Sequence, residues 1–121
     1  MFTISVDSRF SGAHRLVGYQ GKCSALHGHN WKVSAAVRVD ELNQIGMSID
    51  FETLKSLLKE VTDQLDHKYL NELEEFSKTN PTSEHIASHI FRKYRQKLSG
   101  KAKLTSVTVW ESEGQSVTYS P

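Results

Sequence analysis

The stretch Trp31-Lys32-Val33-Ser34-Ala35-Ala36-Val37-Arg38-Val39-Asp40 decides the fold of this chain. Apolar side chains occupy every second position from Trp31 to Val39, and charged or small ones lie between them. Successive side chains of a β-strand point to opposite faces of its sheet. The alternation therefore predicts a strand with one buried face and one exposed face.

The same alternation appears at both ends of the chain. It predicts a strand over residues 2–10 and two more over residues 104–111 and 116–119. Between these strands, apolar residues recur at helical spacing after Asp50 and again after Thr82 or Ser83, which are suitable N-caps. We expect the first helix to end near residues 65–67 and Gly100 to stop the second. The order ββααββ predicts an α+β fold, with both helices on one face of a four-stranded antiparallel sheet.

Length and composition narrow the classes of protein. The 121 residues are enough for a single domain, spanning residues 1–121. A net charge of +1 with scattered cations argues against nucleic-acid binding. We expect neither a signal peptide nor a membrane span, because the chain begins with an alternating segment and has no long apolar run. Cys23 is the only cysteine, which favours a reducing, cytoplasmic setting.

Three histidines are candidate metal ligands. His27 and His29 share the parity of Trp31, so both are expected on the buried face, and His14 shares the parity of Phe10 on the first strand. If the two strands are neighbours, the three imidazoles meet. Three neutral imidazoles with an open fourth position are typical of catalytic zinc. The alternative is a chance cluster, because the chain has 6 histidines.

Each of the other candidate polar residues has more than one interpretation. Cys23 is either a base or nucleophile of lowered pKa or a fourth ligand of a structural zinc. Asp66 and His67 follow the first helix, where they form either a functional pair or a capping pair. Glu111 lies on an apolar strand face, where its carboxylate needs water, a basic side chain, or a ligand with paired N–H donors such as a guanine or a pterin.

Two further histidines lie four residues apart on the second predicted helix. His85 and His89 flank its apolar stripe and could bind a metal ion, but no acidic or thiol side chain is expected to complete a ligand set with them. We interpret both as surface histidines.

Taken together, these segments resemble one known family. The matching segments are Ala13–Leu16, Cys23–Asn30, Ser48–Phe51, Leu65–Asn71, Asn80–Glu84 and Val109–Glu111. The combination is similar to the 6-pyruvoyl-tetrahydropterin synthases and extends from about Phe2 to Tyr119. Three residues separate Cys23 from the His-Gly-His motif, as in the bacterial 6-carboxy-5,6,7,8-tetrahydropterin synthases of queuosine biosynthesis. Animal-type enzymes have five residues there.

The resemblance implies a fold and a chemistry. It implies the tunnelling fold (T-fold), with subunits assembled into a homo-oligomer, commonly a hexamer, whose active sites lie between subunits. It implies Zn²⁺ on His14, His27 and His29, and Glu111 as the anchor of the pterin ring.

The resemblance also implies the reaction. Cys23 would abstract a proton, and His67, held by Asp66, would return one. The expected reaction converts 7,8-dihydroneopterin triphosphate to 6-carboxy-5,6,7,8-tetrahydropterin, acetaldehyde and triphosphate. The alternatives are triphosphate elimination alone, giving the pyruvoyl product, and a non-catalytic zinc- or pterin-binding protein.

Overall fold

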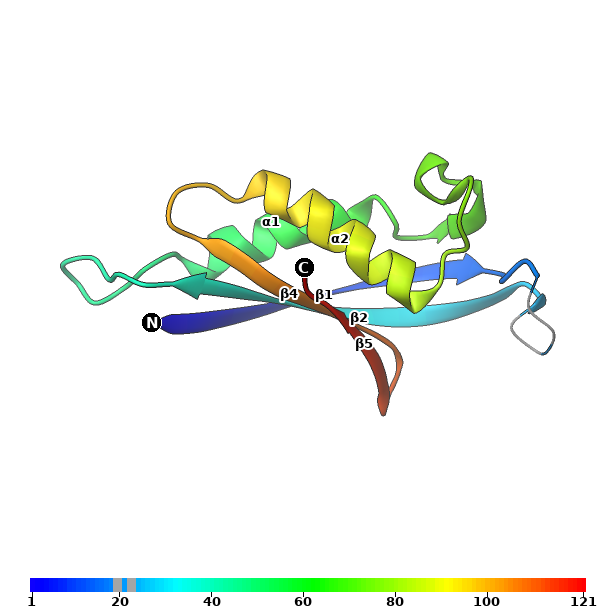
Figure 1. Ribbon diagram of the computed structural model, residues 1–121, viewed down its shortest axis with the longest axis horizontal. Helices are drawn as coiled ribbons and strands as arrows, with labels where there is room; N and C mark the ends of the chain where they lie inside the picture. The colour runs from blue at the N-terminus through cyan, green and yellow to red at the C-terminus, as the bar shows by residue number, and fades with distance from the viewer. Residues whose placement is uncertain (19–20, 22–23) are drawn as a thin grey trace.

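A twisted β-sheet with two helices on one face makes up the computed structural model, which describes all residues except 19–20 and 22–23 (Figure 1). The strands and helices are β1 (Phe2–His14), β2 (His27–Val39), α1 (Phe51–Asp63), β3 (Lys68–Tyr69), α2 (Ser83–Lys97), β4 (Lys103–Ser112) and β5 (Gln115–Tyr119). Two short 3₁₀ turns, η2 (Leu70–Glu72) and η3 (Glu74–Phe76), lie between β3 and α2. The predicted ββααββ order and α+β class are confirmed.

The described strands form one sheet in the order β3-β1-β2-β4-β5. The pairs β1–β2, β2–β4 and β4–β5 are antiparallel, as predicted. The prediction of four strands omitted β3, which pairs in parallel with Gly12 and Ala13 of β1. Two residues are too few for an alternating pattern, so β3 left no signal in the sequence.

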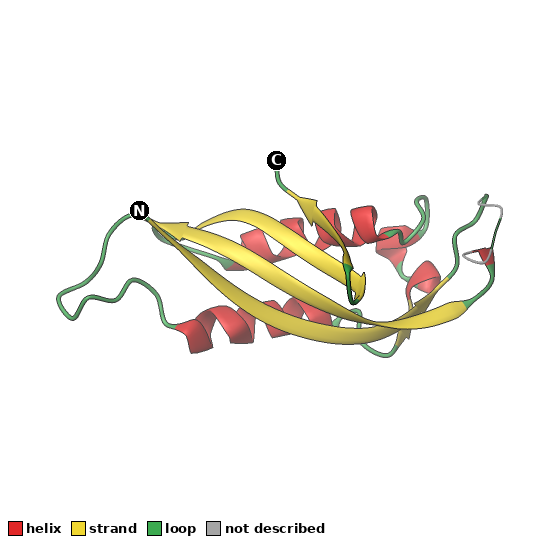
Figure 2. Cartoon of the chain, turned by 90° about the horizontal axis from the view of Figure 1, so that it is seen from below, coloured by secondary structure: helices red, strands yellow, loops and turns green. Residues whose placement is uncertain are grey.

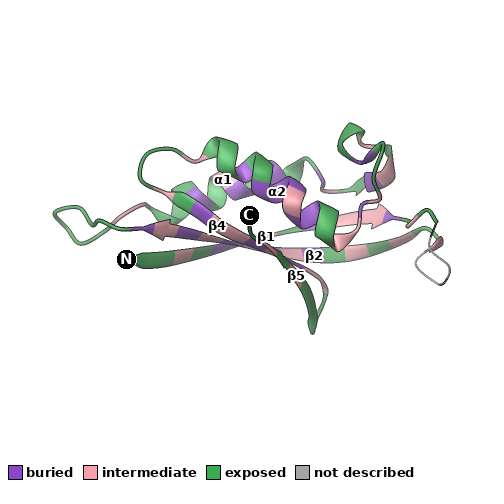
Figure 3. Cartoon of the chain, viewed as in Figure 1, coloured by how far each residue is buried: buried purple, intermediate pink, exposed green. Residues whose placement is uncertain are grey.

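Both helices lie over the same sheet face, and the other face is open in the view from below (Figures 1 and 2). Helix α1 packs on β1, while α2 packs on β4 and β5. Most of the buried residues lie on both helices and on the strands that they cover (Figure 3). The largest fully buried ones include Trp31, Tyr94, Phe91, Leu54 and Leu58. Burial of each large apolar side chain stabilises the fold by about 1.5–3 kcal/mol.

The N-caps of both helices are residues that the sequence predicted. Asp50 accepts a hydrogen bond from Glu52 N, and Thr82 accepts one from His85 N. Helix α1 ends at Asp63, before the expected residues 65–67, because the backbone tightens there into i→i−3 hydrogen bonds such as Leu65 N to Thr62 O. Neither described helix is long and apolar enough to cross a membrane.

Candidate metal and active site

The ends of β1 and β2 bring three imidazoles together on the helix-facing side of the sheet. His14 pairs directly with His27, and His29 lies opposite Gly12. Ligand atoms of these histidines and of Glu111 all lie within 4.8 Å of one another. We call these four residues the imidazole cluster. The predicted meeting of His14 with the His27–His29 pair is therefore confirmed.

Backbone carbonyl groups determine the tautomers of two of the rings. His14 Nδ1 lies 2.7 Å from Pro81 O, and His27 Nδ1 lies 2.7 Å from Ala25 O. A carbonyl oxygen only accepts, so each Nδ1 carries the proton and donates. Each neutral ring therefore presents a lone pair at Nε2, and these two Nε2 atoms are 2.9 Å apart. Two lone pairs at this distance repel unless a cation lies between or beside them.

The third ring is close to the carboxylate. His29 Nε2 lies 2.6 Å from Glu111 Oε1, and His14 Nε2 lies 3.6 Å from the same oxygen. The first contact lacks hydrogen-bond geometry, so His29 Nε2 stands among the buried side-chain atoms that have no hydrogen-bond partner within the described residues. Burial lowers the pKa of His29; Glu111 opposes this effect, whereas His14 and His27 add to it. A lowered pKa favours the neutral, metal-binding form of the ring.

The donor set fits a divalent metal ion. Three imidazole nitrogens and one carboxylate oxygen are ligands typical of zinc and related transition metals. The carbonyl partners of His14 and His27 are the outer contacts that orient metal-bound imidazoles in proteins. The side chain of Glu111 is 29% exposed, so a ligand can approach the cluster beside it. The four residues could therefore hold a metal ion with access for a substrate.

Asp66 and His67 form a pair just beyond α1. His67 Nδ1 lies 2.8 Å from Asp66 Oδ2, an orientation that becomes possible because His67 adopts a left-handed backbone conformation (φ 57°). Asp66 Oδ1 also accepts a hydrogen bond from Ser11 N at 2.8 Å. The Ser11 N–H first, and then His67, lower the pKa of Asp66, so its carboxylate stays ionised and orients the ring.

The Asp66–His67 pair lies beside a hollow that it shares with one member of the imidazole cluster. The His67 side chain is 82% exposed and lines a hollow of about 680 Å³ together with Ser11, Gly28, His29 and Asn30, so the hollow reaches the cluster at His29. Among the described residues, no hydrogen bond or ion pair joins Asp66 or His67 to the cluster within one protomer. Cys23, the third predicted catalytic residue, lies outside the described residues.

The interpretation of His85 and His89 as surface residues is half wrong. His85 is exposed, and its Nδ1 donates to Asn80 O at 2.7 Å. His89 is only 4% exposed and packs against Phe76, with the ring centroids 5.5 Å apart. The segment that contains Phe76 folds over α2, and the helical pattern alone gave no sign of this cover.

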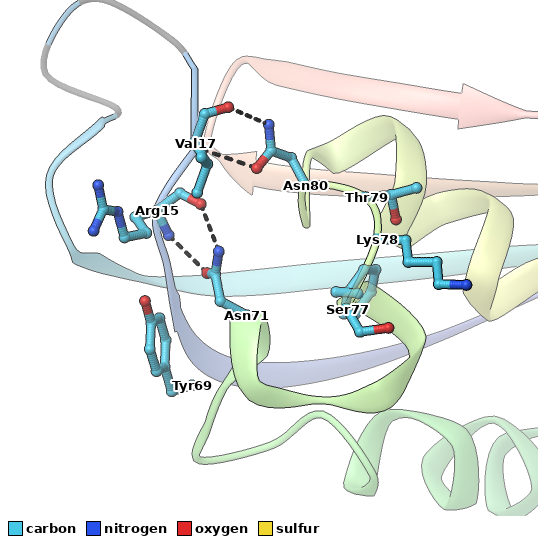
Figure 4. A pocket seen from close by; sticks show the side chains of 9 residues that line it. Arg15, Val17, Tyr69, Asn71, Ser77, Lys78, Thr79 and Asn80 are labelled. Carbon is cyan, nitrogen blue, oxygen red and sulfur yellow. Dashed lines mark hydrogen bonds between the residues drawn. The ribbon is translucent and has the colours of Figure 1, made fainter.

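Two asparagines near the cluster had no predicted role. The side chains of Asn71 and Asn80 bind the backbone of residues 15 and 17, just after His14 (Figure 4). They line a pocket of about 490 Å³. The cationic side chains at its rim, Arg15 and Lys78, point away from each other, so they do not form an anion site (Figure 4).

Comparisons with known proteins agree with this architecture. A sequence model described as "PTPS: 6-pyruvoyl tetrahydropterin synthase" matches residues 3–121. A Synechocystis relative named 6-carboxy-5,6,7,8-tetrahydropterin synthase is 38% identical over 117 residues, covering 93% of this chain and 88% of the relative. A Haemophilus influenzae relative of the same name is 36% identical and covers 93% of this chain and 94% of its own length.

A solved structure is also similar. The Caenorhabditis elegans 6-pyruvoyl tetrahydropterin synthase matches with a TM-score of 0.89 and 31% identity, covering 99% of this chain and 95% of the other. The fold, the imidazole cluster and these matches agree over nearly the full length. The chain therefore belongs to the 6-pyruvoyl tetrahydropterin synthase family.

Proposed function

We propose that this protein is a zinc-dependent 6-carboxy-5,6,7,8-tetrahydropterin synthase. It would convert 7,8-dihydroneopterin triphosphate to the carboxypterin, acetaldehyde and triphosphate, as a cytoplasmic step towards queuosine. The observation that carries the proposal is the convergence of the His14, His27 and His29 side chains, in a chain 38% identical to a relative of that name. The three-residue spacing between Cys23 and His27 supports the carboxy subgroup.

Zinc is the metal that the donor set supports best. Three imidazoles leave a fourth position open, as at catalytic zinc sites. Bound zinc would act as a Lewis acid on the hydroxyl groups of the substrate's side chain. The carbonyl partners of His14 and His27 would keep both rings in the tautomer that zinc requires.

Proton transfer would fall to Cys23 and His67. The Cys23 thiolate would abstract a proton from the substrate's side chain, and His67 would return one to the ring. Asp66 supports this role because its ionised carboxylate holds Nδ1–H of His67, leaving Nε2 as the reactive nitrogen. His67 is 82% exposed, and no described hydrogen bond or ion pair joins it to the cluster, which supports a homo-oligomer, for example a hexamer, whose sites combine groups from neighbouring subunits.

Glu111 would anchor the pterin through its paired N–H donors. Its Oε2 lies 3.5 Å from Ser83 Oγ at the start of α2, while Oε1 faces His29 and His14. The carboxylate can therefore accept from a ring that approaches the metal. Glu111→Gln should raise KM and leave zinc affinity intact, whereas a zinc ligand at this position would lose affinity on the same change.

A second candidate is the 6-pyruvoyl-tetrahydropterin synthase reaction, which stops after triphosphate elimination. The likeness to the C. elegans structure of that name favours it. The test incubates zinc-loaded protein with 7,8-dihydroneopterin triphosphate and identifies the products by mass spectrometry. Carboxypterin with acetaldehyde supports the proposal, and the pyruvoyl compound alone supports the second candidate. Zinc binding without turnover would favour a non-catalytic protein instead.

A further inference from the structure

Two asparagine side chains hold the chain that leaves β1 as a neighbouring strand would (Figure 4). Arg15 N donates to Asn71 Oδ1, and Asn71 Nδ2 donates to Arg15 O, both at 2.9 Å. Val17 N donates to Asn80 Oδ1 at 2.9 Å, and Asn80 Nδ2 donates to Val17 O at 2.8 Å. Each amide satisfies both backbone groups of one residue, as in a hydrogen-bonded pair of an antiparallel sheet.

These bonds continue a row along the same edge of β1. Earlier in the row, Ser11 N donates to Asp66 Oδ1, and His67 N donates to Ser11 O. Strand β3 then pairs with the next residues, Gly12 and Ala13. Asn71 and Asn80 extend the row to Arg15 and Val17, where the chain has no strand beside it. Segment 66–80 therefore replaces a full edge strand with a short strand and side chains.

His14 lies inside this row and depends on the same segment. Its Nδ1 donates to Pro81 O, the carbonyl next in sequence to Asn80. The backbone of Asn80 is itself held, because its carbonyl accepts from His85 Nδ1 at 2.7 Å and Thr82 caps α2. Asn80 therefore connects the start of α2 to the segment that follows His14 at the end of β1.

We propose that Asn71 and Asn80 are positioning residues for the imidazole cluster. They fix the backbone on the C-terminal side of His14 and keep Pro81 O within reach of its Nδ1, so that Nε2 stays directed at the cluster. Loss of an outer partner such as Pro81 O typically weakens metal binding by about 10–100-fold, and the asparagines act one contact further out, so their loss weakens binding by up to that factor. The inference rests on metal binding within the proposed function and does not depend on the pterin chemistry.

Zinc affinity tests this role, measured by competition with a chromogenic chelator on Asn71→Ala and Asn80→Ala. We expect weaker affinity in each variant, by up to about 100-fold. We also expect an altered visible absorption spectrum when Co²⁺ replaces zinc, because the geometry of His14 changes. A purely structural role would lower the melting temperature but leave the Co²⁺ spectrum of the folded protein unchanged.

Asn43→Ala is the matched control. Asn43 Oδ1 also accepts two backbone hydrogen bonds, from Ile45 N and Met47 N at 3.0 Å each, in the loop between β2 and α1 at the opposite end of the sheet (Figure 1). We expect this variant to keep the parent's zinc affinity. Equal losses of zinc affinity in Asn43→Ala and Asn71→Ala would overturn the inference. Parental zinc affinity and a parental Co²⁺ spectrum in Asn71→Ala and Asn80→Ala would overturn it too.

An aspartate variant covers the case in which the alanine variants fail to fold. Asn71→Asp keeps the acceptor for Arg15 N but places a carboxylate oxygen against Arg15 O, so we expect weaker zinc binding in a folded protein. Parental affinity in this variant would contradict the inference. If the parent binds zinc in an asparagine-dependent manner but turns over no pterin, the proposed function fails and the inference stands. If the parent binds no metal, both fail.

Discussion

The Nε2 atoms of His14 and His27 lie 2.9 Å apart, while each ring donates its Nδ1–H to a backbone carbonyl oxygen. In neutral rings this arrangement places two lone pairs face to face. It is unfavourable in the metal-free protein and becomes favourable once a cation binds. The cluster could therefore hold a metal ion, and backbone carbonyl groups already orient two of its rings.

The first prediction concerns metal binding. His14→Ala and His27→Ala should each weaken zinc binding by more than the about 10–100-fold typical of a lost outer partner, because each removes a direct ligand. Zinc at about 100 times its Kd should stabilise the parent by about 2.7 kcal/mol, visible as a higher melting temperature. His67→Ala is the matched control and should keep the zinc affinity of the parent. Equal weakening in all three variants would show that the cluster is not the zinc site.

The second prediction concerns Cys23. Cys23→Ala should keep one zinc per chain and the parental melting temperature, while turnover falls by about 10²–10⁴-fold with the loss of a general base. Metal analysis, thermal unfolding and a product assay on the same sample check this. Loss of zinc and fold together would instead identify Cys23 as a structural ligand.

The third prediction concerns Asp66. Asp66→Asn still offers an acceptor to Ser11 N but no longer holds His67 with a charge, so kcat should fall by about a hundredfold. Asp63→Asn is the control, since Asp63 pairs only with Lys59 on the exposed face of α1. Unchanged kcat in Asp66→Asn would exclude the Asp66–His67 pair from proton transfer.

The lowered pKa of Asp66 also makes the free energy of unfolding depend on pH. The stabilisation is present above the unfolded-state pKa of about 3.8 and is lost as the pH falls through the lower folded-state value. Between pH 7 and pH 3, Asp66→Asn should therefore lose less stability than the parent. Urea unfolding at both pH values measures the difference, and an equal loss in the two proteins would contradict the assignment.

The fourth prediction concerns buried His89. Burial lowers the pKa of His89. The charge of Glu75 opposes this effect, whereas Arg92 and Lys93 add to it. The unfolded chain then binds a proton more readily than the folded one, so stability falls as the pH drops below about 6.5. His89→Phe keeps the packing against Phe76 and should remove part of this acid sensitivity, measured by urea unfolding at pH 7.5 and 5.5. The same pH dependence in both proteins would contradict the prediction.

Four strands, two helices and the meeting of three histidines could be predicted, because strand alternation is a strong signal. The parity of Trp31 to Val39 gave the buried face, and the same parity placed His27 and His29 beside His14. The helix caps at Asp50 and Thr82 followed from their side chains.

Features that depend on tertiary contacts were missed. Strand β3 is two residues long and exists because the edge of β1 is available beside it. The burial of His89 depends on Phe76, which comes from a segment without periodicity. The hydrogen bonds of Asn71 and Asn80 join residues more than 50 positions apart, and asparagine side chains carry no pattern that reports such partners.

The central claim is that the imidazole cluster holds a catalytic zinc ion. The most direct test removes metal with a chelator, adds zinc back stepwise, and follows release of triphosphate and acetaldehyde from 7,8-dihydroneopterin triphosphate. The account predicts no turnover without metal and activity that rises linearly until each chain carries one zinc. Full activity in the stripped protein, or in a His14→Ala variant that binds no zinc, would contradict it.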